Sequence, residues 1–402
     1  MTTSVEPSLA KRPDHVPADL VRDFDYIRDE GIVSNPHGRM AEIARTMPPL
    51  FWTPHYGGHW VINSRSLLSE AATDPARFSS ERGSIPPIPG DPKLIPLTYD
   101  PPEHTAFRFP ANRLFSPKGV RHLEPVIRSM TNGLIDAVID KGGCEFLHEI
   151  AEPLPVVLFM QMAGMPSDRI KEFRALAEHA TASPDPALRG AAIQQIGGIL
   201  AETIQARLAE PKDDLITHIV TADYDGRKLT FEEMINYITL LFLGGLETVV
   251  NSISFNIHYL AVNPSIQDAL RADPGSLPRA IEELLRLHAI PMTARRVAQD
   301  TQLNDVSLKA DELVMLLIPA INYDPAVYAD ARSFSLIRRE PHVTFNMGPH
   351  RCIGANLARL ELRIFFEQWL ARVPPFRIDP KKPPRFYGGL NLAVRSLNLR
   401  WN

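Results

Sequence analysis

The feature that most constrains this chain is Cys352, which lies between glycines in the stretch FNMGPHRCIG (residues 345–354). The stretch runs directly into a helical pattern over residues 355–373. Backbone N–H groups at a helix N-terminus favour a negative charge, so the pattern predicts a thiol that loses its proton easily and binds a metal. Gly348 and Gly354 would let the backbone approach a large, flat group closely.

The number of cysteines narrows the kind of metal site. The chain has only two, Cys144 and Cys352. A structural zinc site needs four ligands in paired spacing, and neither a second cysteine nor clustered histidines accompany Cys352 in the sequence. A single thiolate suits the axial ligand of a heme iron. The competing interpretation is a buried, inert cysteine, which is the better hypothesis for a cysteine considered alone.

The spacing around Cys352 resembles the heme-binding loop of the cytochrome P450 superfamily, aromatic-x-x-Gly-x-His/Arg-x-Cys-x-Gly. Phe345 takes the aromatic position and His350 the basic one. The resemblance implies that the cofactor is heme b (iron protoporphyrin IX), that Cys352 binds its iron, and that Phe345 and His350 contact the heme. One position departs from the common pattern, because Asn346 stands where many relatives carry glycine. Asparagine tolerates unusual backbone angles.

A second informative segment is the helical pattern over residues 231–262, which contains GGLET at residues 244–248. Each glycine weakens a helix by about 1 kcal/mol relative to alanine, so the pair predicts a local need for space or a loosened backbone. The Thr248 hydroxyl is placed to bind the Gly244 carbonyl and to open a small bulge there. Neighbouring helical positions diverge by about 100°, so Glu247 and Thr248 would not both face that space. The alternative is a glycine kink beside a surface acid.

GGLET also matches, at every position, the oxygen-activating segment [Ala/Gly]-Gly-x-[Asp/Glu]-Thr of cytochromes P450. The resemblance implies that Glu247 and Thr248 are catalytic and that they deliver protons during oxygen activation. Most relatives carry Asp where this chain has Glu247.

Two further patterns gain meaning only from the resemblance. His104 opens a helix after Asp-Pro-Pro-Glu, and Arg108 follows on the same face; unaided, this is an ordinary capped helix. In the family, Asp-Pro-Pro-x-His-x-x-x-Arg supplies ligands of the heme propionates, so the resemblance implies that role for His104 and Arg108, and also for Arg295 and His350.

Glu283 and Arg286 are three residues apart on a predicted helix and would by themselves form a surface pair worth a few tenths of a kcal/mol. They match the family's Glu-x-x-Arg. With a further arginine, here Arg338, this motif holds the core behind the heme in relatives.

Length and composition predict one large domain. The 402 residues show no linker, repeat or low-complexity stretch, and 44% are hydrophobic, which suffices for a sizeable core. We predict a mainly α-helical, single cytochrome P450 domain over residues 1–402 with a minor β region, in which residues 1–20 form a poorly ordered N-terminal segment. Short strands are predicted within residues 51–63, and helices over 64–72, 120–140, 151–163 and 190–208.

Charge and hydropathy limit the partners. A net charge of −4 argues against nucleic acid. Residues 1–20 lack the apolar core of a signal peptide, and the longest apolar run, Tyr237 to Leu246, is too short to span a bilayer. We therefore expect a cytoplasmic monomer that binds neither membrane nor nucleic acid.

The implied reaction is monooxygenation, with electrons from an external [2Fe–2S] ferredoxin and its NADH-dependent reductase, because the chain has no flavin or iron–sulfur motif. The rival hypotheses are a heme-thiolate sensor without turnover and a peroxide-using relative; the acid and threonine of GGLET speak against both. A basic docking face is predicted, although solvated surface charge explains each member nearly as well. Its members are Arg108, Arg113, Lys118, Arg121, Arg351 and Arg359.

Family correspondence places six mostly apolar residues around the substrate, which suggests a terpenoid or a similarly small hydrophobic molecule. They are Leu240, Leu243, Gly244, Pro291, Met292 and Asn391. The loop over residues 83–102 is predicted either to line this pocket or to be a rigid surface loop. FWTPHYGGHW and GGLETVVNSISF resemble the bacterial camphor-hydroxylase group. Where those relatives carry a substrate-binding tyrosine this chain has Pro92 or Lys93, which argues against camphor itself.

Overall fold

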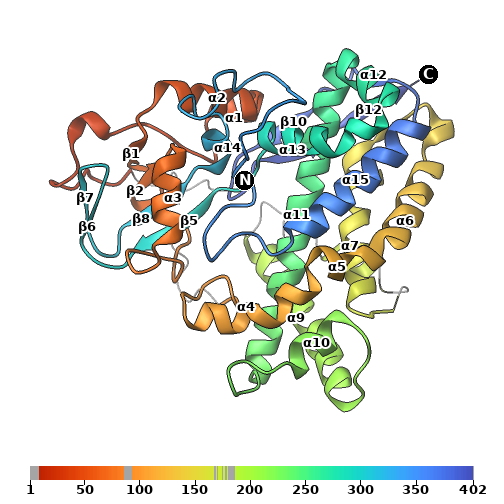
Figure 1. Ribbon diagram of the computed structural model, residues 1–402, viewed down its shortest axis with the longest axis horizontal. Coiled ribbons are helices and arrows are strands. Elements are labelled where there is room, and N and C mark those ends of the chain that lie inside the picture. The colour runs from red at the N-terminus through yellow and green to blue at the C-terminus, as the bar shows by residue number, and fades with distance from the viewer. Residues whose placement is uncertain are drawn as a thin grey trace.

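The computed structural model describes residues 9–85, 93–166, 169, 171–173, 175, 176, 179 and 186–401. A helical bundle forms one side of the molecule and a strand-rich part forms the other (Figure 1). The described helices are α1 Glu30–Ser34, α2 Pro36–Thr46, α3 Arg65–Thr73, α4 Glu103–Leu114, α5 Pro117–Val120, α6 Glu124–Asp136, α7 Pro153–Met162, α9 Pro186–Ala209, α10 Leu215–Thr221, α11 Phe231–Val262, α12 Pro264–Ala272, α13 Leu277–Leu287, α14 Ile318–Ile321 and α15 Ala355–Arg372. This confirms the prediction of a mainly helical fold with a minor β region.

The strands form small sheets. They are β1 Leu50–Thr53, β2 His59–Ile62, β3 Phe78–Ser79, β4 Gly143–Glu145, β5 Thr293–Val297, β6 Thr301–Leu303, β7 Val306–Leu308, β8 Leu313–Leu316, β9 Phe376–Ile378, β10 Arg385–Tyr387, β11 Ala393–Ser396 and β12 Asn398–Trp401. The largest sheet has the order β1-β2-β8-β5-β3. β1 and β2 pair antiparallel with Phe51 opposite Val61, which confirms the predicted strand pair. Of the segment predicted to be poorly ordered, residues 9–20 are described, and Val16 is buried.

Helix α11 runs through the bundle and is its longest described helix. The Thr230 hydroxyl accepts from the Glu233 N–H at 3.2 Å, and the Glu233 carboxylate accepts from the Thr230 N–H at 2.8 Å, a reciprocal cap that fixes the start of the helix. α11 packs against α7, α9, α10, α12 and α13. It is the one described helix long and apolar enough to cross a membrane, and half of its most apolar window is buried inside the protein. It is therefore the core helix of the bundle.

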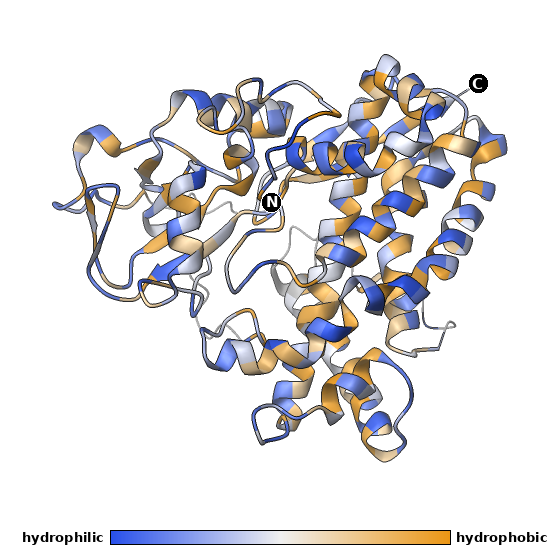
Figure 2. Cartoon of the chain, viewed as in Figure 1, coloured by the Kyte–Doolittle hydropathy of each residue, from blue (hydrophilic) through white to orange (hydrophobic). Residues whose placement is uncertain are grey.

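Helix α15 gives the Cys352 loop a rigid base. It packs along α6 and also contacts α12 and α13. Phe365 and Trp369 stack with ring centroids 5.6 Å apart and are almost fully buried. Burying a large apolar side chain stabilises the fold by about 1.5–3 kcal/mol, so this face anchors the helix. Hydrophobic and hydrophilic residues alternate along the helices of the bundle (Figure 2).

Three predicted elements differ in detail. The helix expected over 120–140 is divided into α5, a 3-10 turn and α6, and Pro125 stands in the first turn of α6 because a proline needs no donor there. The helix expected from Ala151 begins as α7 at Pro153, after a π-helical turn Leu147–Ala151. No bulge forms at Gly244 and Gly245, because α11 is helical throughout. In the loop over residues 83–102, residues 86–92, including Pro92, lie outside the described residues.

Candidate active site

The loop before α15 is a tight turn that presents Cys352. The Cys352 N–H donates to the Phe345 carbonyl at 2.8 Å and closes the turn. Asn346 has φ 56° and Gly348 has φ 69°, so the glycine that relatives carry at position 346 is replaced by a residue that does adopt the left-handed conformation. A Cβ on Gly348 would collide with the Ala72 carbonyl. The turn therefore requires these residue types.

The Cys352 side chain is solvent-accessible on one side. On its other sides, protein groups surround the thiol closely enough to desolvate it. Burial raises the pKa of the Cys352 thiol, and the Gly354 N–H and the guanidinium groups of Arg108 and Arg351 oppose this without reversing it. The prediction that the thiol loses its proton easily is therefore wrong for the polypeptide alone, because desolvation outweighs the helix end. A coordinated metal ion deprotonates a thiol outright.

Three basic side chains lie together, two of them buried and one half-buried, and each has a nitrogen with no hydrogen-bond partner among the described residues. They are His104 from α4, Arg295 from β5 and His350 from the Cys352 loop. The His104 and His350 rings have centroids 4.1 Å apart. Both ring nitrogens of His104, Nε2 of His350 and Nη2 of Arg295 are inaccessible to solvent and find no hydrogen-bond partner in the part of the chain that the structure describes. Burial lowers the pKa of Arg295 to about 10, and burial followed by the charge of Arg108 lowers the pKa of His104 to about 4.

Arg108, which was predicted to act with His104, is turned toward the Cys352 loop. Its Nη2 donates to the Arg351 carbonyl. Burial lowers the pKa of Arg108, and the charge of the Cys352 thiolate would raise it. The structure thus brings His104, Arg295 and His350 together and places Arg108 between that group and the cysteine.

The GGLET segment borders open space in the middle of α11. Gly244 and Gly245 are exposed, and a Cβ added to either would meet nothing within 4 Å. The Thr248 hydroxyl donates to the Gly244 carbonyl at 2.9 Å, as predicted. The two glycines therefore provide room without breaking the helix.

Two asparagines that the sequence analysis did not associate with Glu247 contact it. Asn251 Nδ2 donates to the Glu247 carbonyl at 2.9 Å, and Asn391 Nδ2 lies 3.4 Å from Glu247 Oε2. Asn251 follows Glu247 by one helical turn, so helix periodicity could have identified it. Asn391 is 144 residues away in sequence, and no local pattern signals its contact.

The other residues predicted around the substrate lie near this segment but differ in exposure. Leu240, Leu243 and Pro291 are partly exposed. Met292 is only 2% exposed and packs in the main core. Pro291 forms a β-bridge with Asn391, which brings the C-terminal strands beside α11.

Glu283 and Arg286 are buried rather than on the surface. Arg286 Nε and Nη2 donate to the Glu283 carboxylate at 2.9 and 2.8 Å, and Arg338 Nε donates to the same carboxylate at 3.0 Å. The surface pair expected from spacing alone is therefore wrong, and Arg338 lies where the resemblance implies. Arg286 also donates to the Asn322 and Ala331 carbonyls.

Comparison with known proteins decides the family. Residues 188–274 and 276–398 match the sequence profile of the family described as Cytochrome P450. The probable cytochrome P450 127A1 of Sinorhizobium fredii is 32% identical over 403 residues, covering 97% of this chain and 96% of that protein. The chain belongs to the cytochrome P450 family. The steroid C26-monooxygenase of Mycobacterium tuberculosis is another relative, 33% identical over 338 residues and covering 80% of this chain and 90% of that protein.

Solved structures support the same assignment. CYP101J2 and CYP101C1 both superpose with a TM-score of 0.91, at 36% and 31% sequence identity, and each comparison covers 98% of this chain and 100% of the other. These neighbours confirm the predicted likeness to the bacterial camphor-hydroxylase-like group and the cytochrome P450 fold. The protein is a cytochrome P450 monooxygenase, an oxidoreductase that binds heme b through a cysteine thiolate and takes O2 and a hydrophobic substrate.

The residues present fit this cofactor. The nitrogens of His104, Arg295 and His350 that lack a partner among the described residues suit the two propionates, because a buried donor without an acceptor is costly. Cys352 and the bare backbone at Gly244 and Gly245 supply a ligand and space. Among the described residues, no group of three or more His, Cys, Asp or Glu could itself hold a metal ion.

Proposed function

We propose that this cytochrome P450 hydroxylates a small hydrophobic substrate, with Cys352 as the thiolate ligand of the heme iron. The observation that carries the proposal is the hydrogen-bonded Cys352 loop beside basic donors that have no acceptor among the described residues. When bound, heme would supply one-electron and oxygen chemistry, with Cys352 as the thiolate that holds it. Cofactor binding, proton delivery and substrate binding are assigned to the side chains around the heme.

The propionates are assigned to His104, Arg108, Arg295 and His350. Charge-assisted hydrogen bonds from cationic donors to carboxylates are roughly twice as strong as neutral ones. Arg295 is 5% exposed and keeps one donor nitrogen without a partner, so a carboxylate there would satisfy it. Phe345, at the start of the loop, packs against the main core, and the Arg359 guanidinium lies 4.6 Å from its ring centre.

Thr248 and Glu247 are assigned to proton delivery. The Thr248 hydroxyl donates to Gly244 at the edge of the open space, so its oxygen is free to accept a hydrogen bond from a water there. Glu247, the preceding residue of α11, is assigned the exchange of protons with solvent. Glu283, Arg286 and Arg338 have a structural role behind the heme.

Electrons are proposed to come from a [2Fe–2S] ferredoxin and its NADH-dependent reductase, in the cytoplasm, to a monomer of this enzyme. The basic face predicted for docking is smaller than expected. Arg359 pairs with Glu282 at 2.6 Å, and Arg108 Nη2 donates to the Arg351 carbonyl. Its remaining exposed members are Arg113, Lys118, Arg121 and Arg351.

The substrate is proposed to be a terpenoid or a similarly small apolar molecule. Leu240, Leu243 and Pro291 border the site with apolar surface. Screening terpenoids and steroids for a shift of the Soret band tests this class. If only molecules of steroid size shift the band, the terpenoid proposal is wrong.

The catalytic roles are tested by measuring NADH, oxygen, hydrogen peroxide and product together. Thr248→Ala should still bind substrate and consume oxygen, but product should fall and peroxide rise, because the water that the hydroxyl orders is lost. Glu247→Gln should slow the whole cycle instead, since it removes the exchangeable acid. A fully coupled Thr248→Ala enzyme would remove Thr248 from the relay.

The same measurement separates the rival functions. A heme-thiolate sensor would not couple NADH consumption to product when ferredoxin and reductase are added. A peroxide-using relative would turn over with hydrogen peroxide at the same rate in Thr248→Ala and in the unmodified enzyme.

A further inference from the structure

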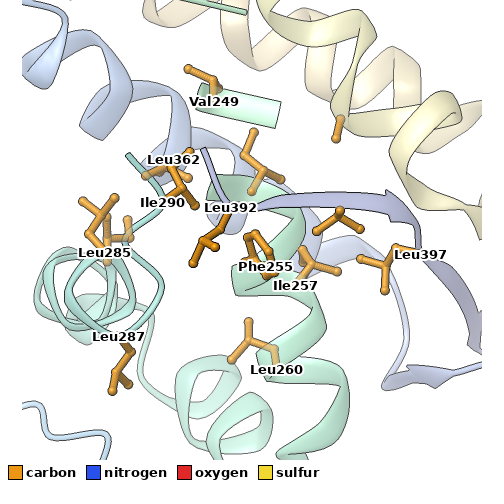
Figure 3. Packing of buried hydrophobic residues seen from close by; sticks show 14 of the residues in the cluster. Val249, Phe255, Ile257, Leu260, Leu285, Leu287, Ile290, Leu362, Leu392 and Leu397 are labelled. Atoms are coloured by element: carbon orange, nitrogen blue, oxygen red, sulfur yellow. The ribbon is translucent and has the colours of Figure 1, made fainter. Parts of the chain in front are cut away.

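The turn between β10 and β11 is fastened to the segment before β5. The Met292 N–H donates to the Leu390 carbonyl at 2.8 Å, and the Leu392 N–H donates to the Ile290 carbonyl at 3.0 Å. Leu392 is fully buried and lies in the core close to Ile290 and Phe255 (Figure 3). Asn391 stands between these two anchored residues, so its backbone is held in place on both sides.

The same strands are tied to the turn of α11 that carries Glu247. Asn251 Oδ1 accepts from the Val394 N–H at 2.9 Å while its Nδ2 donates to the Glu247 carbonyl at 2.9 Å. Asn251 is 3% exposed, so this connection is shielded from water. The main chain at Glu247 and the main chain near Asn391 are therefore held in a fixed relation.

The Asn391 side chain contacts the Glu247 carboxylate, and the main-chain segments that carry the two residues are held in place. Its Nδ2 lies 3.4 Å from Glu247 Oε2, a long hydrogen bond that reaches the carboxylate from outside α11. A glutamate has three side-chain torsions, and holding it in one orientation costs entropy unless a fixed group binds it. Asn391 is such a group, because hydrogen bonds of the residues on both sides of it hold its backbone in place.

We propose that Asn391 is a positioning residue for Glu247, linking the substrate-facing turn to the acid that delivers protons. The inference rests on the proposed role of Glu247. Asn391 acts by orienting the carboxylate through a donated N–H, and Pro291, its bridge partner, borders the substrate region. A substrate that contacts this turn therefore lies close to Asn391, which contacts the Glu247 carboxylate.

The test compares Asn391→Leu, which keeps the size of the side chain and removes the donor, with the unmodified holoenzyme. The first readout is the infrared carboxyl band of Glu247 in the ferric enzyme, identified by its loss in Glu247→Gln. The second is ferredoxin-supported oxygen uptake without added substrate, in H2O and in D2O. We expect the band to shift, oxygen uptake to slow three- to tenfold and the solvent isotope effect to rise, while Asn391→His, which keeps an N–H donor, restores much of the rate.

Two controls make the outcome decisive. Leu390→Ala alters an exposed residue of the same turn and should change neither the band nor the isotope effect. In a Glu247→Gln background, Asn391→Leu should slow uptake by less than twofold, since the two residues act as a unit. If Glu247→Gln itself does not slow uptake, the proposed role of Glu247 fails. If it slows uptake but Asn391→Leu leaves the band and the rate unchanged, the inference fails and the proposed function stands.

Discussion

Two buried arginines of this protein lie in opposite situations. Arg286 is 1% exposed and Arg295 is 5% exposed. Arg286 donates to the Glu283 carboxylate and to the carbonyls of Asn322 and Ala331. Among the described residues, Arg295 donates to the neighbouring Ala294 carbonyl at 2.7 Å and its Nη2 has no partner.

The polypeptide itself supplies the hydrogen-bond acceptors of Arg286, whereas in this account the cofactor supplies an acceptor for Arg295. An unpaired buried charge is costly, so a fold retains one where the partner arrives from outside the chain. Behind the heme, Glu283 and Arg338 complete the network around Arg286. In the proposed site, Arg295, His104 and His350 are the donors assigned to the heme propionates.

The largest expected effect falls on the completed network. Arg286→Leu leaves Glu283 buried with only Arg338 as an ionic partner, and breaking a buried pair costs about 3–5 kcal/mol. We expect little folded, heme-loaded protein and a much lower urea midpoint.

Arg363→Leu is the matched control for this change. Arg363 pairs with Glu124 and Glu367 on the protein surface, where ion pairs contribute about 0–1 kcal/mol. Equal stability of the two variants would contradict the contrast.

The unsatisfied site should respond differently. Arg295→Leu removes a buried cation, so the polypeptide should keep its helical circular dichroism. Heme retention should weaken by about 10- to 100-fold, because a charge-assisted hydrogen bond contributes about 1.5–3 kcal/mol. The rate of heme transfer to apomyoglobin measures this. Unchanged transfer in Arg295→Leu, together with unchanged transfer after substitution of His104, Arg108 and His350, would remove the propionate assignment.

A third region contains buried histidines that are uncharged, unlike the two arginines. His37, His258 and His288 lie between α2, α11 and α13, where His37 Nε2 is 3.0 Å from the Ala289 carbonyl and His288 Nδ1 is 2.9 Å from Asn256 Oδ1. Burial lowers the pKa of His37 and of His258 to about 4, and the pKa of His288 is also lowered by burial and by its histidine neighbours.

These shifts predict acid sensitivity. The unfolded chain takes up protons near pH 6.5, before the folded protein does near pH 4, so stability falls as the pH falls through this window. The loss should be about 1 kcal/mol per histidine at pH 5.5. Urea unfolding between pH 7.5 and 5 measures it. His258→Phe should flatten the dependence, and an unchanged slope would show that His258 takes up its proton at the same pH in the folded and the unfolded protein.

The sequence predicted what local geometry controls. Residue types in the Cys352 loop predicted its turn, and Asn346 has the backbone angle expected where relatives carry glycine. Spacing within α11 predicted the Thr248 hydrogen bond to Gly244. The bounds predicted for α11 from hydrophobic periodicity agree with the structure.

What failed depends on burial and long-range packing. The Cys352 pKa was predicted in the wrong direction because desolvation by distant segments is invisible in a local motif. Gly244 and Gly245 cost α11 about 2 kcal/mol together, which the packing of this long, capped helix offsets, so no bulge forms. The contact of Asn391 with Glu247 arises only from the folding of the C-terminal strands onto α11.

The central claim is that Cys352 supplies the thiolate, and the difference spectrum of the ferrous carbon monoxide complex tests it most directly. Cys144, the other cysteine, is buried in β4, where burial raises its pKa, and it faces no heme in this account. Cys144→Ala should keep the red-shifted band typical of thiolate ligation, and Cys352→His should lose it while still binding heme. Retention of the band in Cys352→His, or its loss in Cys144→Ala, would contradict the account.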